Sequence, residues 1–472
     1  MTESEERRTE DRDGGNNSGP RPPALRPKDG HLEVSSMRMY SETRSALAER
    51  RFGHMDGSDY PVAQLRSRGK VVGHAVMRPP ATDEGYVDPD WLVEGVQEMW
   101  RLRDGLSDLD ADVLDAMTAA WISQGPTDDR SLARISVDRI LEARGIRPKA
   151  GGSGRRGGYG PEQRQEIIDA IGRVQSVAVE MEMDWPENVP AGKKPRMSRR
   201  RVHSRLVVIT DAVIAEQLRL DGLARYDGFS FRVGEAVETF LSLPAGRQAA
   251  LLSLTALRYD PYRQIAEKRL ARGLSERWRV GASREGQYRR PYRVADLVRT
   301  AGMEEFAPSR PQRRKERLEK ALDTLEADKV IAAWEYEEST FVDPMSRPRQ
   351  GWEDLWLGST ILIEPPDIVK DFCDAIADRK NTIDKKKTRG LPPREKTDIG
   401  TRLKAWREKR KLSQRAATDR LNVLSGGASI SQGYLSLIER GKKEPATELR
   451  ARIETLISGT HSVSAGNPRG EI

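Results

Sequence analysis

The chain lacks several features that mark common protein classes. Its 472 residues contain one cysteine, Cys373, which excludes an internal disulfide and a cysteine-rich zinc site. No run of about 18 apolar residues occurs, so no segment is expected to cross a membrane. The first residues, MTESEERRTEDRDGG, have no apolar core of a signal peptide. These absences predict a cytoplasmic protein that contacts no membrane.

Motifs for common enzyme chemistry are also absent. No GxxxxGK[ST] segment exists, and the glycine-rich GGSGRRGGYG lacks the Lys–Ser/Thr pair that holds phosphate and magnesium in an ATP site. The five histidines stand far apart, with no two at metal-ligand spacing: His31, His54, His74, His203 and His461. We therefore expect no catalytic residues, no metal and no cofactor. One enzyme class stays open, a recombinase or nuclease, for which Arg201, His203 and Arg205 form a fragment of a site.

Charge dominates what is present. Charged residues make up 33% of the chain and hydrophobic residues 36%, with a mean hydropathy of -0.70. This composition suits several small helical domains joined by solvated linkers. The net charge of +8 and the pI near 9.4 favour an anionic partner. Residues 379–415 hold 15 Lys or Arg against four Asp or Glu, which indicates either a nucleic-acid contact or a solvated basic linker.

The apolar pattern begins late in the chain. Residues 1–88 show little periodicity, and we expect a mostly disordered arm there. From Pro89 onward the apolar spacing predicts four helices, which cover residues 91–100, 106–121, 137–141 and 161–174. The period then changes from 3.6 to 2, which predicts a strand over 177–183. We expect its return strand at 206–210, beyond the acid-free linker AGKKPRMSRRR.

The same order of elements returns after about 150 residues. The segments VDRILEARG, GPEQRQEIIDAIGRVQ and VAVEMEM are echoed by VADLVRTAG, PQRRKERLEKALDTLE and VIAAWEYE. In this second copy we expect helices over 233–243, 248–257, 262–271, 294–300 and from Pro311, then strands over 330–336 and 356–364. The length of the repeat suits two copies of a domain better than a solenoid.

Each copy, helices followed by a hairpin, is typical of a winged helix, which presents its last helix to a DNA groove. In the second copy, Arg313, Arg317 and Lys320 fall on the face opposite Leu318, Leu322 and Leu325, as phosphate and guanine contacts require. Arg310 and Arg314 extend this basic helix start. In the first copy, Arg164 stands among acids, so DNA would have to be attracted by loop residues, which are Lys149, Arg155 and Arg156. The alternative is an ordinary solvated face. We expect unequal copies, with the second binding DNA more tightly and the first serving dimerisation.

The most specific pattern lies at Leu412–Pro445. Ser413 and Ser431 are placed to cap two helices, and Gly441 is placed to end the second. The LSQ start and the IERGKKEP ending resemble the Cro/repressor-like helix-turn-helix family over Asp398–Ile457. The resemblance implies that Gln414 buttresses the recognition helix and that four residues face bases: Gln432, Gly433, Tyr434 and Ser436. The turn at 422–430 is about seven residues longer than the family's, and the alternative is a small helical bundle with a polar turn.

These patterns predict a mainly α protein with small β wings. We expect a mostly disordered arm over 1–88, winged-helix domains over 89–215 and 216–366, a basic linker with a short helix over 367–397, a helix-turn-helix over 398–460 and a disordered tail over 461–472. The tandem order resembles the replication initiators of iteron plasmids and related mobile elements. That resemblance implies a bacterial, nucleoid or plasmid associated protein that binds double-stranded DNA at repeated origin sites. We expect a monomer or homodimer on DNA that recruits host replication proteins. The alternative is a transcriptional regulator.

Overall fold

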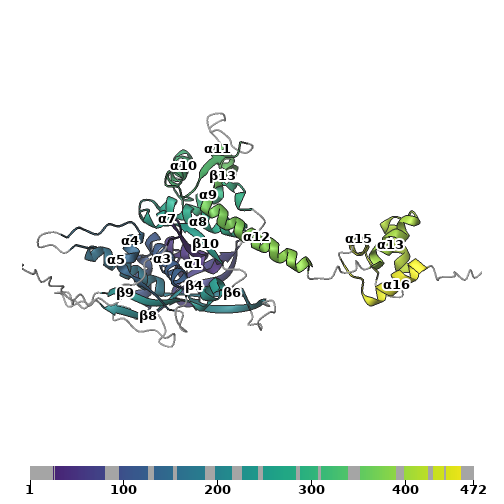
Figure 1. The fold of residues 1–472 in the computed structure, drawn as a ribbon, viewed down its shortest axis with the longest axis horizontal. Helices are drawn as coiled ribbons and strands as arrows, with labels where there is room; N and C mark the ends of the chain where they lie inside the picture. The colour runs from purple at the N-terminus through teal and green to yellow at the C-terminus, as the bar shows by residue number, and fades with distance from the viewer. Residues whose placement is uncertain are drawn as a thin grey trace, which may run out of the picture. The chain divides into compact units, whose positions relative to one another are not determined.

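The computed structural model describes residues 25, 27–67, 69–79, 95–125, 132–151, 157–186, 197–214, 226–242, 248–282, 287–306, 310–338, 351–389, 398–423, 429–440 and 443–458. The chain divides into two compact units, Met1–Asp378 and Arg379–Ile472. Its fold is mixed α/β with several small sheets (Figure 1). The expectation of a mainly α fold with only small wings is therefore corrected, because the first unit contains more strand than its helical periodicity indicated.

The segment after residue 30 belongs to the core of the first unit. It forms β1 (His31–Ser35), α1 (Arg38–Ala48), β2 (Gly53–Met55), β3 (Ser58–Ser67) and β4 (Lys70–Met77). Met39, Tyr40 and Leu47 of α1 are fully buried. The expected disordered arm over 1–88 is thus wrong for residues 31–77, while residues 1–24 and 80–94 lie outside the described residues. The local sequence pattern did not predict these strands because their partner strands lie far along the chain. Strand β1 pairs with β10, and β4 pairs with β6.

The next elements follow the sequence pattern closely. They are α2 (Val96–Asp104), α3 (Asp108–Gln124), β5 (Ala133–Ser136), α4 (Val137–Ala143) and α5 (Pro161–Gln175). Ser107 caps α3 by accepting from the Leu109 N–H, and the Asp110 carboxylate accepts from the Ser107 N–H in return. Pro161 occupies the first turn of α5, where its missing N–H costs nothing. The apolar stripe of α5 is buried, as its spacing predicts.

The hairpin after α5 is built into a five-stranded sheet of order β2-β3-β4-β6-β7. Strand β6 (Val177–Pro186) pairs with β7 (Met197–Arg205), so the basic segment read as a linker is in part the return strand. The expected return strand at 206–210 starts another strand, β8 (Val207–Ile214), which pairs with β9 (Tyr226–Val233). The segment AGKKPRMSRRR was interpreted as a linker because it is rich in arginine and lysine and contains no acid. In the sheet, Arg199 and Arg201 pair across β7 and β6 with Glu182 and Glu180.

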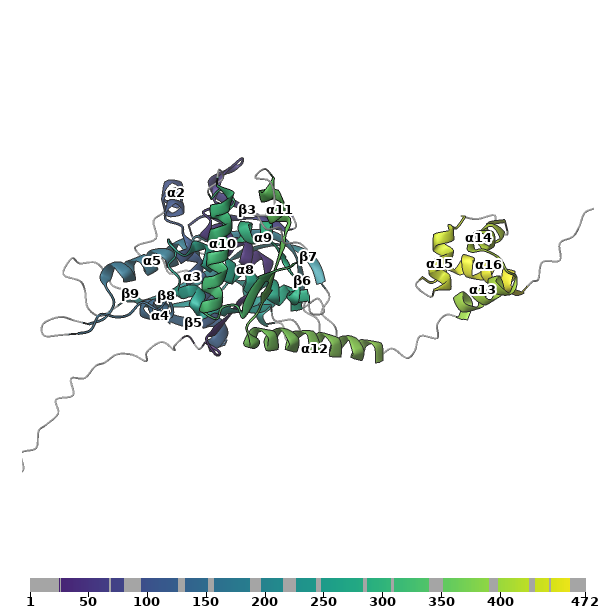
Figure 2. The same ribbon diagram turned by 90° about the horizontal axis from the view of Figure 1, so that it is seen from above.

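The second copy begins with α6 (Glu235–Ser242), β10 (Ala249–Ser253), α7 (Leu254–Arg258) and α8 (Ile265–Ala282). The helix expected over 248–257 is wrong for its first half, because the apolar run Ala249–Ser253 pairs as a strand with β1. Helix α8 extends well past the expected 262–271. It packs against α10 and β10, and Figure 2 shows α10 lying over it.

A small three-stranded sheet closes the second copy. A 3-10 turn η2 (Gln287–Arg289) precedes β11 (Tyr292–Arg293), α9 (Val294–Thr300), α10 (Pro311–Ala327), β12 (Ala333–Tyr336), α11 (Trp352–Gly358) and β13 (Thr360–Glu364). The sheet order is β11-β13-β12. The return strand expected over 356–364 is corrected to β13, since Trp356 lies in α11 and is fully buried.

Buried ion pairs join the two copies through α3 and α8. Three aspartates of α3, Asp108, Asp112 and Asp115, are at most 1% exposed. The Arg272 guanidinium reaches all three. The Lys268 ammonium lies 2.7 Å from an Asp112 oxygen and donates also to the carbonyls of Ala256 and Leu257. Since an ion buried without its partner is very costly, this network fixes α8 against α3. The two expected winged-helix segments accordingly share one hydrophobic core.

The second unit is helical. Helix α12 (Asp367–Arg389) runs from the first unit into the second, and α13 (Asp398–Lys409), α14 (Gln414–Val423), α15 (Gln432–Glu439) and α16 (Thr447–Ser458) follow. Its core contains Leu403, Ala417, Leu435 and Ile453, all fully buried. The residue expected to end α15, Gly441, lies outside the described residues.

Candidate nucleic-acid interface

The first half of helix α10 presents cations to solvent, although the acids Glu316, Asp323 and Glu326 are exposed on the helix as well. Leu318, Leu322 and Leu325 are fully buried, as the spacing predicts. On the opposite side Arg313 and Lys320 are exposed, and so is Arg310 at the start of the helix. Because no carboxylate pairs with these three cations in the described parts of the chain, their charges stay available to an anion.

Two of the predicted α10 contacts have structural roles instead. Arg314 is 7% exposed; it donates to the Phe306 carbonyl and pairs with Glu353 at 2.8 Å. The Arg317 guanidinium lies 3.1 Å from a carboxylate oxygen of Glu267, which is 3% exposed, and it also donates to the Arg263 carbonyl. These two arginines hold α10 on its neighbours, and their charges are compensated within the protein.

Helix α5 differs from α10 in charge. Arg164, its predicted contact, lies 2.5 Å from the Asp138 carboxylate of α4. Exposed positions of α5 include the acids Glu162 and Asp169. The other predicted contacts of this copy, Arg155 and Arg156, lie outside the described residues. The described surface of α5 therefore offers little attraction to a polyanion.

Burial shifts the pKa of two groups that hold these helices. Burial raises the pKa of Asp110 to about 6, although Arg173 of α5 lies 2.6 Å away and opposes the shift. Burial lowers the pKa of Lys268 to about 8, against the attraction of Asp112. Both groups lie in the interior, so we assign them to the framework that orients the helices.

In the second unit, α14 and α15 form the expected helix pair. Ser413 accepts from the Ala416 N–H, and Ser431 accepts from the Tyr434 N–H. Gln414 donates to the Glu439 carboxylate at 2.9 Å, at the far end of α15. Glu439, which is 8% exposed, also receives two bonds from Arg407, at 2.7 and 3.1 Å. Sequence reasoning missed Arg407 and Glu439, because they are 32 positions apart with no local pattern to join them.

The first turn of α15 holds the residues that the resemblance placed on DNA bases. Gln432 and Gly433 are exposed, whereas Tyr434 and Ser436 are half-buried. The Lys443 ammonium stands 4.6 Å from the centre of the Tyr434 ring, a cation–π distance. Gln432 and Gly433 are thus the most accessible of the four, and the Tyr434 ring is partly covered.

A single side chain closes the long turn before α15. The Asn422 amide donates to the Ile430 carbonyl at 3.1 Å, and its oxygen accepts from the Ile430 N–H at 2.8 Å. Residues 424–428, inside this turn, lie outside the described part of the chain. Ile430 stands two residues before α15. The two hydrogen bonds from Asn422 therefore tie the end of α14 to the start of α15 across the long turn. In the sequence, only the presence of an asparagine near the end of α14 could have indicated this contact.

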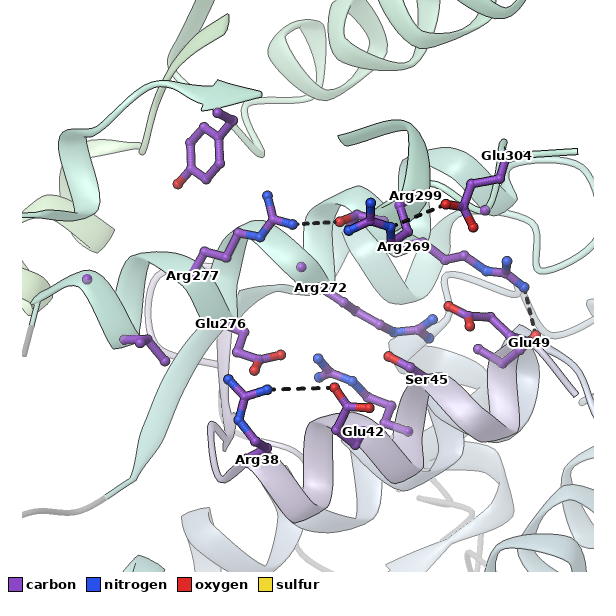
Figure 3. Close-up of a pocket in the computed structure, with 18 of the residues that line it drawn as sticks. Arg38, Glu42, Ser45, Glu49, Arg269, Arg272, Glu276, Arg277, Arg299 and Glu304 are labelled. Carbon is purple, nitrogen blue, oxygen red and sulfur yellow. Dashed lines mark hydrogen bonds and ion pairs between the residues drawn. The ribbon is translucent and has the colours of Figure 1, made fainter. Parts of the chain in front are cut away.

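A cleft of about 910 Å³ in the first unit is lined by α1, α8 and the end of α9 (Figure 3). Its charges largely compensate one another: Arg51 pairs with Glu49, and Arg299 pairs with Glu304. Arg272 is bound to the α3 aspartates behind the cleft. Among the described residues no group of three His, Cys, Asp or Glu could hold a metal ion, and no helix is long and apolar enough to span a bilayer. We assign no ligand to this cleft.

Comparisons with known proteins give a distant structural likeness. No protein-family model and no curated protein matches the chain. Two crystal structures of domains 2 and 3 of RctB, one of them from selenomethionine derivatives, share 12% identity with it. The selenomethionine structure covers 60% of this chain and 85% of its own at a TM-score of 0.30. The other covers 69% and 98% at 0.31. At values this low the function has to be argued from the residues.

Proposed function

We propose that this protein binds double-stranded DNA without catalysing a reaction, and that it initiates replication at repeated origin sites of a plasmid or mobile element. The observation that carries the proposal is the charge of α10. Arg310, Arg313 and Lys320 are exposed on one side of a helix whose other side is fully buried. Cations on one face of a rigid helix suit the regular spacing of backbone phosphates.

The order of elements around α10 adds support. Helix α8, strand β11, helices α9 and α10 and strand β12 follow one another, and then helix α11 leads to strand β13, which lies between β11 and β12. This order resembles a winged helix, in which the third helix enters the major groove. Lys320 and Arg313 would then contact phosphates or guanine edges, whereas Arg314 and Arg317 would keep α10 in place.

The C-terminal helix pair supplies the base reader of the proposal. Gln432, Gly433 and Ser436 would contact base edges, while Gln414 and Arg407 hold α15 through Glu439. Replacing Gln432 with alanine is expected to relax base preference at one or two positions. Binding to random DNA would stay, because α10 supplies it. Sequence selection with purified wild type and variant measures the difference.

The initiator role has its own test. An initiator is expected to bind direct repeats beside an AT-rich region and, with those repeats, to maintain a reporter plasmid. The same modules would serve a transcriptional regulator, whose site would be a palindrome upstream of a gene and would not support replication. Footprinting on the DNA around the gene, followed by the plasmid maintenance assay, separates the two functions.

A further inference from the structure

The segment that we call the α7–α8 turn consists of Arg258, the last residue of α7, and residues 259–264, and it has a fixed shape. The Asp260 carboxylate accepts from the N–H groups of Tyr262 and Arg263, at 2.8 and 2.9 Å. The Asp260 N–H donates to the Gln264 side chain at 3.0 Å. These three bonds are made within the turn itself, so they fix its conformation locally.

This turn touches both third helices, α5 and α10. The Tyr262 hydroxyl donates to Glu166 of α5 at 2.8 Å. Arg317 of α10 donates to the Arg263 carbonyl at 3.3 Å. The Tyr259 hydroxyl donates at 2.9 Å to Asp328, which follows the last residue of α10. The α7–α8 turn therefore bridges the two surfaces that the repeat pattern assigned to DNA.

The outer side of the turn is basic. Arg258 and Arg263 are exposed, and neither has a carboxylate within ion-pair distance among the described residues. The aliphatic part of Arg258 lies over Gly145, at the end of α4. Tyr262 is 57% exposed, with its ring on the surface and its hydroxyl fixed by Glu166. Four acids contact the turn. Asp260 accepts from N–H groups of the turn and is attracted by Arg263, and Glu267 pairs with Arg317. Glu166 and Asp328 accept from the hydroxyls of Tyr262 and Tyr259.

We propose that the α7–α8 turn is a third DNA contact, in which Arg258 and Arg263 bind backbone phosphates between the surfaces of α5 and α10. The proposal rests on the DNA binding proposed above. It also supplies the attraction that α5 lacks: a duplex held by α10 would be kept against the first copy by these two guanidinium groups. Such contacts add affinity without sequence preference, because phosphates are the same at every step.

The test uses the full chain with Arg258→Ala and Arg263→Ala combined, in titrations of a selected duplex and a random duplex at several salt concentrations. Affinity is expected to fall by the same factor on both duplexes. The plot of log affinity against log salt should flatten by about 1.8, since each lost phosphate contact removes about 0.9. In an ethylation-interference experiment, the phosphates that contact the α7–α8 turn should interfere with binding of the wild type and no longer interfere with binding of the variant. The pair Arg258→Lys and Arg263→Lys should keep most of the slope.

The matched control combines Arg66→Ala and Arg101→Ala, exposed arginines of β3 and α2 that remove the same charge elsewhere. If the α7–α8 variant and this control change the salt slope equally, the turn is not a specific contact and the inference is wrong, while the proposed DNA binding stands. If the wild-type chain shows no salt-dependent binding to either duplex, the proposed function fails as well. Thermal unfolding of each variant establishes that the fold is kept.

Discussion

Helices α5 and α10 occupy corresponding places in the sequence repeat, yet they differ in the cations that they present to solvent. Both begin with proline, both follow a short helix and both bury an apolar stripe. The single predicted cation of α5, Arg164, is bound to Asp138, whereas Arg313 and Lys320 of α10 are exposed. The two helices thus share their buried positions and differ at their exposed ones. A repeat in the sequence therefore does not imply repetition of a contact.

The strands after the two helices differ in the same way. Strand β6 lies between β4 and β7 in a five-stranded sheet, whereas β12 is an edge of a three-stranded one. Strand β6 of the first copy therefore has a neighbouring strand on each side, whereas β12 of the second copy has one on a single side among the described residues. Together with the charges, this difference favours a structural role for the first copy and DNA binding for the second.

The largest expected effect concerns the interface that both copies share. Asp112→Ala would leave the Lys268 ammonium buried without its carboxylate, which should lower the free energy of unfolding by about 3–5 kcal/mol. Both copies should be lost in one transition, as α3 and α8 share a core. Urea unfolding followed by circular dichroism measures this. Combining Asp112→Leu with Lys268→Met should restore only part of the loss, because the buried Arg144 and Arg272 also pair with Asp112. Two separate transitions would contradict a shared core.

The second prediction removes the charge that distinguishes α10. Arg313→Ala with Lys320→Ala should reduce affinity on specific and random duplexes alike and flatten the salt dependence by about 1.8. Both side chains are exposed, so stability should change little. Fluorescence anisotropy at several salt concentrations measures the effect. Equal losses from Gln163→Ala with Gln165→Ala on α5 would mean that the two helices contribute alike, and the comparison would fail.

The third prediction runs in the opposite direction, on α5. Glu162→Lys with Asp169→Lys would give this helix exposed cations in place of acids. If the first copy lies near DNA, affinity for random duplex should rise and the salt slope should steepen by up to about 1.8. The same titrations measure it. An unchanged slope would place the α5 surface away from the duplex and sharpen the contrast with α10.

The last prediction is a pH dependence of stability in the first copy. The pKa of Asp110, raised to about 6 by burial, lies above its ordinary value. Between pH 4 and 6 the folded chain would hold a proton that the unfolded chain has released, so the free energy of unfolding should fall as pH rises, by up to about 3 kcal/mol for a shift of about two pKa units. Asp110→Asn should remove this part of the pH profile. Urea unfolding of both proteins at pH 4, 5, 6 and 7 gives the difference, and parallel profiles would contradict it.

Helices with a regular apolar stripe were predictable from the sequence. Helix α9 has the predicted bounds, and α3, α4 and α5 differ from the prediction by a few residues. Strands whose partners are far along the chain were not predictable, because the pairing that stabilises them is invisible locally. Strand β1 pairs with β10, which comes more than 200 positions later in the chain. Strand β7 resembles a basic linker in composition, although two of its arginines, Arg199 and Arg201, pair with glutamates of β6.

The candidate site was predictable only in part, for a related reason. The helical wheel of α10 identified which side faces solvent, and Arg313 and Lys320 lie there. It could not show that Glu267 and Glu353 would bind Arg317 and Arg314, since those acids come from other elements. In the second unit the two caps were readable from single serines. The roles of Asn422 and Glu439 depend on contacts across the helix pair.

The central claim is that the chain binds duplex DNA through cations concentrated on α10. Its most direct test is a titration of the purified full chain with a fluorescent random duplex between about 50 and 200 mM salt, the range over which phosphate contacts weaken strongly. We expect saturable binding whose affinity falls steeply with salt, and a shallower slope for Arg313→Ala with Lys320→Ala. No binding at the lowest salt, or a slope unchanged by the double substitution, would contradict the claim.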